Sequence, residues 1–339
     1  MSIMDVRGNL SLPPSSLEQA YCGQNVQLAL LSFWLRHTVH VLSHVTAVLG
    51  IGFNVINLCV FARQGFQDTI NISLSGLAVS DMATSAVFLA YHPASLVLET
   101  VYGRKPTELI HLGSWLSYGL TINSSCLALF ICLERYLCVA FPLKVKDMIT
   151  PKVTVKAVIA IFLVTITTVL PAMLALRFSW YFDKYANQTI LALIFMEHTS
   201  DLANVSYVLS TSIQIPALIC LCGVTALLIW LLSGHKKELR GFLDAHTSHH
   251  SMRRRKRTAK MVVFLSSVIL VCFVPAQLAS VATLLNPDFD AGGRHDTAYK
   301  LSWAVIFLLH MANSSVNLCF YYSMSSRFRS TLTLMLKRR

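Results

Sequence analysis

The sequence predicts an all-α membrane protein, a seven-transmembrane helix bundle followed by a short amphipathic eighth helix. The 339-residue chain is 55% hydrophobic and only 13% charged, whereas a soluble domain carries about 25% charged residues. Seven apolar segments reach the roughly 20 residues that a helix needs to cross a bilayer. Lysine and arginine gather on alternate connectors between these segments. A soluble protein of this composition would expose large apolar patches, which lipid tolerates.

The apolar segments justify the seven spans one by one. They cover residues 39–61, 70–98, 109–141, 155–176, 202–232, 259–285 and 299–322, and an amphipathic stretch follows at 326–336. The connectors between them hold the proline, glycine, asparagine and charged residues that are typical of turns at a water boundary. We therefore expect an extracellular N-terminal tail (1–37), a seven-transmembrane domain (38–324), and a cytoplasmic helix and tail (325–339).

The basic residues predict how the chain is oriented. Of its 28 lysine and arginine residues, 18 fall on the odd-numbered connectors and the C-terminal tail, and 8 fall on the opposite side. Positive charge is retained on the cytoplasmic side of a membrane, so we expect a multi-pass protein of the plasma membrane with its N-terminus outside. The net charge of +12 then reflects orientation and attraction to anionic membrane lipid, and does not indicate nucleic acid. Glycosylation sequons at Asn9, Asn187 and Asn204 fall on the predicted outer side.

Three charged residues lie within the predicted spans, where charge is costly and usually functional. Asp81 is in the middle of the second span, and Glu134 and Arg135 are near the end of the third. Other spans carry polar groups at the depth of Asp81, namely Asn54, Ser124, Asn313 and Asn317. These oxygens around one carboxylate suit a small hard cation such as sodium, and they equally suit a water network. The sequence leaves both interpretations open.

Glu134, Arg135 and Tyr136 close the third span, and Pro142 and Leu143 follow six and seven residues after the tyrosine. By itself this triplet is also consistent with an interfacial ion pair, in which the arginine reaches the lipid headgroups.

Taken together, the motifs resemble those of the rhodopsin-like (class A) G-protein-coupled receptors over nearly the whole chain. The matching motifs are Asn54-Val55 in the first span, Leu77 to Asp81 (LAxxD) in the second, Glu134-Arg135-Tyr136 (D/E-R-Y) in the third, Pro216 in the fifth, Cys272 to Pro275 (CWxP) in the sixth, Asn317 to Tyr321 (NPxxY) in the seventh, and Phe328 in the eighth helix. Within the family, residues 61–81 and 134–152 look most like molluscan chemosensory receptors.

The chain departs from the family pattern at several positions. Ile110 stands where the family has the cysteine of an outer disulfide, and no cysteine follows between residues 177 and 201. Phe273 replaces the sixth-span tryptophan, Leu318 the seventh-span proline, Ile161 the fourth-span tryptophan, and Val224 a common fifth-span tyrosine. We expect these changes to alter the activation geometry and to leave the fold intact.

The resemblance implies a role for each motif. A heterotrimeric G protein would meet Glu134, Arg135, Tyr136, Pro142 and Leu143. Movement of the sixth helix would pass through an activation switch made of Pro216, Phe273, Pro275, Asn317 and Tyr321. By family spacing, the ligand pocket would include Ser117, Tyr118, Thr121, Ala276, Gln277, Ser280, Phe307 and His310.

The expected ligand follows from the residues in that pocket. Ser117 stands where amine receptors carry an acid, and Met311 stands where opsins carry the retinal lysine. The remaining lining is neutral, polar and aromatic, so we expect an extracellular chemosensory small molecule. A neuropeptide is the alternative within the same family.

Other classes of protein fit the sequence less well. A membrane transporter is the alternative from another class, but paired repeats and broken spans are not evident. No catalytic motif supports an enzyme, and no cofactor is expected apart from the possible sodium ion.

Overall fold

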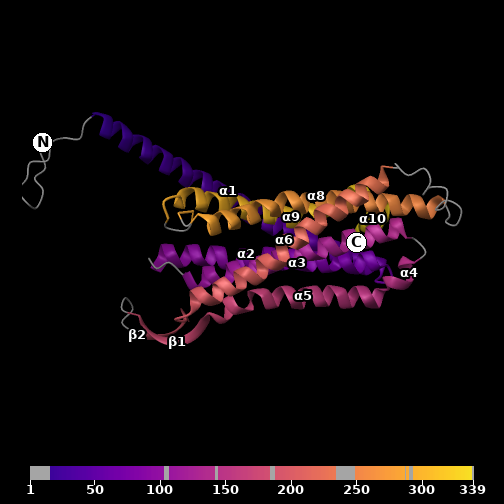
Figure 1. Ribbon diagram of the computed structural model, residues 1–339, viewed down its shortest axis with the longest axis horizontal. Coiled ribbons are helices and arrows are strands. Elements are labelled where there is room, and N and C mark those ends of the chain that lie inside the picture. Colours follow the sequence, from indigo (N-terminus) through magenta and orange to yellow (C-terminus); the bar gives the residue numbers. More distant parts are fainter. Residues whose placement is uncertain are drawn as a thin grey trace, which may run out of the picture.

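The computed structural model describes residues 16–102, 107–141, 144–183, 188–233, 249–286, 288–289 and 293–337. Across these ranges, seven long helices run side by side and form a single bundle (Figure 1). They are α1 (Ser16–Gln64), α2 (Thr69–Tyr102), α3 (Thr107–Ala140), α5 (Pro151–Leu174), α6 (Thr199–Leu232), α8 (His249–Leu285) and α9 (Asp296–Met324). Each of these helices holds a segment long and apolar enough to cross a membrane. The predicted seven-transmembrane bundle is confirmed.

Shorter elements lie at the two ends of the bundle. At one end are α4 (Val145–Met148) and α10 (Ser326–Lys337). At the other end, β1 (Leu176–Asp183) and β2 (Gln188–Phe195) form an antiparallel hairpin that pairs Leu176 with Phe195. Figure 1 shows the hairpin and α10 at opposite ends of the molecule. We call these ends the hairpin end and the α10 end.

The helix boundaries follow local chemistry. Gly65 has a φ of 84°, and its N–H bonds the carbonyl of Phe61 at 3.0 Å. This left-handed cap is one that glycine favours, and it ends α1. At the start of α5, the Thr150 side chain accepts a bond from the N–H of Val153, and Pro151 occupies a first-turn position where its missing N–H costs nothing. The helix α1 begins at Ser16, well before the predicted start of the first span at residue 39.

The hairpin was not predicted. Its first strand alternates Leu176, Phe178, Trp180 and Phe182 with more polar residues, which is the period-two pattern of a strand. The apolar run of the fourth span extends to residue 176 and obscures this pattern, so the segment does not stand out from the span and its connector.

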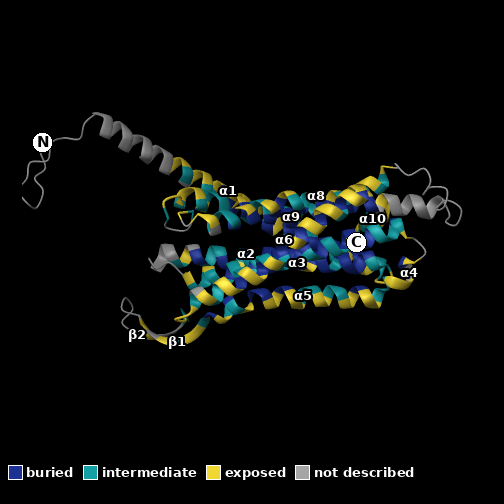
Figure 2. Cartoon of the chain, in the orientation of Figure 1, coloured by how far each residue is buried: buried dark blue, intermediate teal, exposed yellow. Residues whose placement is uncertain are grey.

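The inner and outer surfaces of the bundle differ as expected for a protein in lipid. Buried residues face the centre, and exposed residues cover the outside (Figure 2). Large apolar side chains such as Leu163, Val208 and Val271 are exposed on the outer surface, where hydrocarbon solvates them. The main apolar core includes Leu77, Ile131, Leu265 and many others. The interior also holds many buried polar side chains, and these determine the candidate site.

Small residues allow two helices to approach closely at the hairpin end. Gly113 of α3 lies against Tyr91 of α2, and a Cβ atom added to this glycine would lie 2.2 Å from the tyrosine ring. Close backbone approach through small residues is a common way of packing membrane helices.

We therefore predict that Gly113→Ala destabilises the protein by about 1–3 kcal/mol, because an added methyl group overpacks this contact. The matched control is Gly223→Ala in α6, where an added Cβ meets nothing within 4 Å. Both changes carry the same gain in helix propensity. Thermal unfolding of the two purified variants would measure the difference, and equal melting temperatures would contradict the prediction.

Candidate functional site

Asp81 organises the middle of the bundle. Its side chain is buried, with the residue only 2% exposed. Ser124 of α3 donates a hydrogen bond to Asp81 Oδ1 at 2.8 Å, and Asn317 of α9 donates to Oδ2 at 2.7 Å. Ser314 of α9 donates to the backbone carbonyl of Asp81, also at 2.8 Å. One residue of α2 therefore joins α3 to α9, and the structure brings together three of the five residues predicted for this site.

The other two predicted residues, Asn54 and Asn313, differ from each other. The amide nitrogen of Asn54 donates to the carbonyls of Gly50 at 2.9 Å and Ser314 at 2.8 Å, and its oxygen accepts a bond from Asn57. Asn54 thus links α1 to α9 and makes no hydrogen bond to the carboxylate of Asp81. The Oδ1 atoms of Asn313 and Asn317 are buried and have no hydrogen-bond partner among the described residues. These two oxygens, with Ser124 and the carboxylate, fit the donor set that a small hard cation prefers.

The network extends from Asp81 to α5 through residues that the sequence did not single out as a site. Ser124 also bonds the hydroxyl of Ser80 at 3.0 Å, and Asn123 donates to the same hydroxyl at 2.9 Å. Thr165 of α5 donates to Asn123 Oδ1 at 3.2 Å. This chain of side chains connects four helices and satisfies polar groups that would otherwise be buried without partners.

Glu134 and Arg135 form a buried ion pair near the α10 end. Two side chains of α2 hold the glutamate: Thr69 donates to Oε1, and Ser73 donates to Oε2 at 3.1 Å. Arg135 Nη2 donates to Glu134 Oε1, while the arginine Nε has no partner in the described part of the chain. Glu134 is therefore bound from three sides. The sequence indicated the ion pair, but it did not indicate the clamp from α2.

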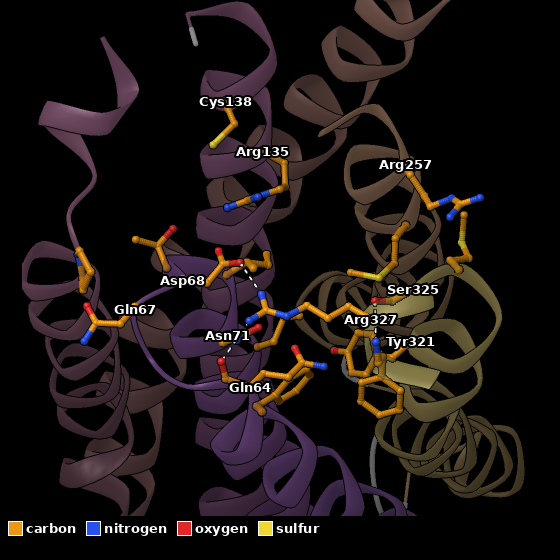
Figure 3. A pocket seen from close by; sticks show the side chains of 18 of the residues that line it. Gln64, Gln67, Asp68, Asn71, Arg135, Cys138, Arg257, Tyr321, Ser325 and Arg327 are labelled. Carbon is orange, nitrogen blue, oxygen red and sulfur yellow. Dashed lines mark hydrogen bonds and ion pairs between the residues drawn. The ribbon is translucent and has the colours of Figure 1, made fainter. Parts of the chain in front are cut away.

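A cleft of about 910 Å³ opens beside Arg135 at the α10 end. Arg135, Arg257 and Arg327 are among its lining residues, with Tyr321 and Phe328. Figure 3 shows Arg327 reaching Asp68 across one side of the cleft. Arg327 Nη1 donates to Asp68 Oδ2 at 3.1 Å, and Arg327 Nη2 donates to the carbonyl of Gln64. Tyr136 is half-buried and packs against the main core. Pro142 and Leu143, also predicted to meet a G protein, lie outside the described residues.

Of the predicted switch residues, Phe273, Asn317 and Tyr321 are buried, Pro275 is half-buried and Pro216 is exposed. The Phe273 ring contacts the His310 ring edge-on, with centroids 5.0 Å apart. Tyr321 is buried and contacts the rings of Phe61 and Phe328 at 5.4 and 5.7 Å. Pro216 and Pro275 lie inside α6 and α8, where each removes one backbone hydrogen bond. With Leu318 in place of the family proline, α9 is a continuous helix.

The residues predicted to bind a ligand lie toward the hairpin end. Ser117, Thr121, Ala276, Gln277, Ser280 and His310 are buried, and Tyr118 and Phe307 are half-buried. Many of their polar atoms are buried without a hydrogen-bond partner among the described residues. These atoms are Ser117 Oγ, Tyr118 OH, both polar atoms of the Gln277 amide, Ser280 Oγ and His310 Nε2. Such groups cost free energy in the absence of a partner, and they cluster at functional sites.

Three residues of α6 extend this group and were missed by the sequence analysis. Tyr207, Thr211 and Gln214 also carry buried polar atoms without a partner in the described chain. The Tyr118 hydroxyl lies beside the side chains of Gln277 and Thr211, which joins α3, α8 and α6. We call Tyr118, Tyr207, Thr211 and Gln277 the outer polar cluster. The sequence does indicate that the three α6 residues belong together, because residues 207, 211 and 214 are three or four apart and share one helical face.

The outer polar cluster is uncharged. Apart from histidine, the charged side chains that the structure describes as buried are Asp81, Glu134 and Arg135, and none belongs to this cluster. Of the predicted glycosylation sites, Asn204 is exposed on α6, while Asn9 and Asn187 lie outside the described residues.

A seven-helix membrane bundle with open hydrogen-bonding groups near one end, and a cleft around a buried arginine at the other, has the architecture of a transmembrane receptor. The family described as "7 transmembrane receptor (rhodopsin family)" matches residues 53–321. The chain belongs to this family of G-protein-coupled receptors, whose members are receptors and not enzymes.

Individual relatives are more distant. The chain is 25% identical to the allatostatin-A receptor of Bombyx mori over 290 residues, which cover 82% of this chain and 73% of that receptor. It is 20% identical to the endothelin receptor type B of Canis lupus familiaris over 324 residues, covering 94% and 71%. The human endothelin receptor type B gives the same identity over 326 residues. None of these relatives is a chemosensory receptor by name.

The clamp on Glu134 leads to a prediction about ligand-independent signalling. Ser73→Ala and Thr69→Val each remove a donor to the carboxylate, and hydrogen bonds to charged groups are worth about 1.5–3 kcal/mol. With Glu134 held less firmly, Arg135 is released more often, so we expect basal signalling to rise about threefold or more.

Second-messenger assays in transfected cells would measure this rise at matched surface expression. Ser75→Ala is the matched control, because Ser75 bonds only the carbonyl of Asn71 in its own helix. Arg135→Ala should abolish the basal signal in every background. Basal activity that is unchanged in both clamp variants would show that α2 does not hold the resting state.

Proposed function

We propose that the protein is a plasma-membrane receptor that binds an extracellular ligand at the outer polar cluster and activates a heterotrimeric G protein at the α10 end. The N-terminus lies outside in this proposal, as the distribution of basic residues favours. The observation that carries the proposal is the uneven satisfaction of buried polar groups. Asp81, Ser80 and Ser124 in the middle of the bundle are hydrogen-bonded to one another. Each member of the outer polar cluster instead has a buried polar atom without a partner among the described residues, which a ligand would supply.

The chemistry of the cluster favours an uncharged part of the ligand. Gln277 offers both a donor and an acceptor, and Tyr118, Tyr207 and Thr211 offer hydroxyls. A charged group placed there would lose its water without gaining an opposite charge. Amides and hydroxyls of a ligand would instead satisfy these groups.

We infer that the ligand is a peptide with an uncharged segment bound at the cluster. The relatives named above are receptors for peptides, allatostatin and endothelin, and they support the neuropeptide alternative. A small neutral chemosensory molecule would satisfy the same groups, but none of the three relatives named above supports it. Membership of a receptor family disfavours a transporter.

Transmission to the G protein would proceed through α8. Gln277 lies two residues from Pro275 and one helical turn from Phe273, so a ligand held by Gln277 acts near the proline hinge. Outward movement of the α10 half of α8 would widen the cleft beside Arg135. The ligand controls this equilibrium only through its different affinities for the two arrangements.

The experiment is expression with a promiscuous G protein and a screen of neuropeptides, amino acids and small neutral odorants. For an active peptide, Gln277→Leu should raise the half-maximal concentration about tenfold or more, since one lost buried hydrogen bond and an unmatched ligand group cost over 1.4 kcal/mol. Ser267→Ala, on the exposed surface of α8, is the control and should respond like the wild type.

Three results would count against the proposal. Activation that persists in Arg135→Ala would contradict G-protein coupling through this site. Equal potency in Gln277→Leu and wild type would remove the outer polar cluster from ligand binding. Responses confined to odorants would support the small-molecule alternative.

We also propose that Asp81, Ser124, Asn313 and Asn317 hold a sodium ion in the resting receptor. Raising NaCl should then lower agonist affinity, whereas choline chloride at the same ionic strength should not. Asp81→Asn should abolish the sodium effect, and the control Asp68→Asn, which removes a carboxylate at the α10 end, should keep it. A sodium effect of equal size in Asp81→Asn would leave the water network as the correct interpretation.

A further inference from the structure

Three histidines meet between α1 and α2 near the hairpin end, outside the site described above. The ring of His92 on α2 lies 4.6 Å from that of His40 and 4.9 Å from that of His44, both on α1, measured between centroids. The ring of Phe88 stacks on His92 at 5.2 Å and contacts His44 at 5.1 Å. Neither the fold nor the proposed ligand binding accounts for this cluster of imidazoles.

The ring nitrogens of these histidines are available as ligands. His44 Nδ1 lies 2.6 Å from the carbonyl of His40. A donor at Nδ1 leaves the lone pair on Nε2, and metal-binding histidines are commonly oriented by such a bond to a carbonyl. The Nδ1 atoms of His40 and His92 are buried and have no partner in the described part of the chain. At least two imidazole nitrogens on different helices are therefore free of hydrogen bonds.

We propose that His40 and His92 bind a Zn²⁺ ion that bridges α1 and α2, with His44 near enough to become a third ligand by side-chain rotation. Among the described residues, no three metal-binding side chains already converge on one point, so the site starts from two histidines. All three rings are only half-buried, which leaves room for water to complete the coordination.

The donor set selects the metal. Imidazole nitrogen suits borderline transition metals, whereas Mg²⁺ and Ca²⁺ require oxygen ligands. The histidines contact aromatic rings and one another. Arg36, one turn from His40, adds positive charge and works against any cation, so only a metal that bonds imidazole directly should bind.

The position of the site connects it to the ligand-binding end of the receptor. The rings of Phe88 and Phe307 of α9 have centroids 6.0 Å apart. Tyr91, next to His92 in the sequence, packs against Gly113 of α3. A metal that fixes α1 to α2 here would also restrict the helices that carry the predicted pocket residues Ser117 and Phe307. Zn²⁺ would therefore stabilise the hairpin end of the bundle.

The experiment measures the melting temperature of the purified full-length protein in lipid nanodiscs, with ZnCl₂ or MgCl₂ and without any agonist. A metal that binds only the folded state raises the free energy of unfolding, and this increase grows with the ratio of free metal to Kd. We expect ZnCl₂ to raise the melting temperature and MgCl₂ to have no effect. His92→Gln and His40→Gln should each weaken the apparent Zn²⁺ affinity by about tenfold or more.

The controls separate this site from other histidines and cysteines. His198→Gln removes an imidazole that is mostly exposed near the same end, and it should respond to Zn²⁺ like the wild type. The double variant His40→Gln/His92→Gln gives the background from the rest of the chain. The two single variants, His40→Gln and His92→Gln, guard against misfolding. Each should have the melting temperature of the wild type in the absence of metal, so that a lost Zn²⁺ response reports lost binding.

An equal Zn²⁺ response in wild type and the double variant would overturn the proposal, as would an equal response to Mg²⁺. The measurement needs neither ligand nor G protein, so its failure would leave the proposed receptor function untouched.

Discussion

The structure depends on the cost of a polar group that lacks a partner inside a membrane. The hydrocarbon of the bilayer offers no hydrogen bonds, so buried donors and acceptors must find their partners inside the bundle. Asp81 satisfies this requirement with donors from α3 and α9, and Glu134 satisfies it with Thr69, Ser73 and Arg135. Because lipid provides little hydrophobic driving force between helices, these bonds, with close packing at small residues, determine which helices are neighbours.

The requirement is left unmet at the two ends of the bundle, where we place the proposed binding sites. In the outer polar cluster, Tyr118 and Gln277 lie close together, but their geometry does not meet the criterion for a hydrogen bond among the described residues. At the other end, Arg135 is bound by Glu134 on one side and faces a cleft on the other. Between them lies the network of Asp81, whose two carboxylate oxygens both accept hydrogen bonds. These bonds join α2 to α3 and α9 in the middle of the bundle, and the proposed partners would supply the missing bonds at the two ends.

The sequence predicted the helices and the depth of each polar residue, because hydropathy and spacing along a chain report both. It correctly placed Asp81 beside Ser124 and Asn317, and Glu134 beside Arg135. It did not predict that Asn54 turns to Ser314, since the direction of a side chain around the helix axis depends on the neighbouring helix. The clamp from Thr69 and Ser73 was missed for the same reason: it requires knowing which face of α2 meets α3.

The hairpin and the α6 part of the outer polar cluster were missed for different reasons. The strand β1 follows directly on a membrane helix, so its apolar residues were absorbed into the fourth span. The family positions that define the expected pocket lie on the third, sixth and seventh spans, so they do not include Tyr207 and Thr211 of α6. Their common helical face was visible in the sequence, but only the structure shows that this face meets Tyr118 and Gln277.

A single face of α9 connects the two ends of the molecule. His310, Ser314, Asn317 and Tyr321 follow one another at intervals of three or four residues, so they lie on the same side of the helix. All four are buried. His310 contacts Phe273 of α8. Ser314 bonds the backbone carbonyl of Asp81, and Asn317 bonds its carboxylate. Tyr321 contacts Phe61 and Phe328.

The contacts along α9 are kept although the chain lacks the family tryptophan (Phe273) and the family proline (Leu318). The Phe273 ring of α8 packs against His310 of α9, and α9 continues as a helix past Leu318. The bonds from Ser314 and Asn317 to Asp81 therefore lie on the same face of α9 that contacts α8 through His310, between the two ends of the molecule.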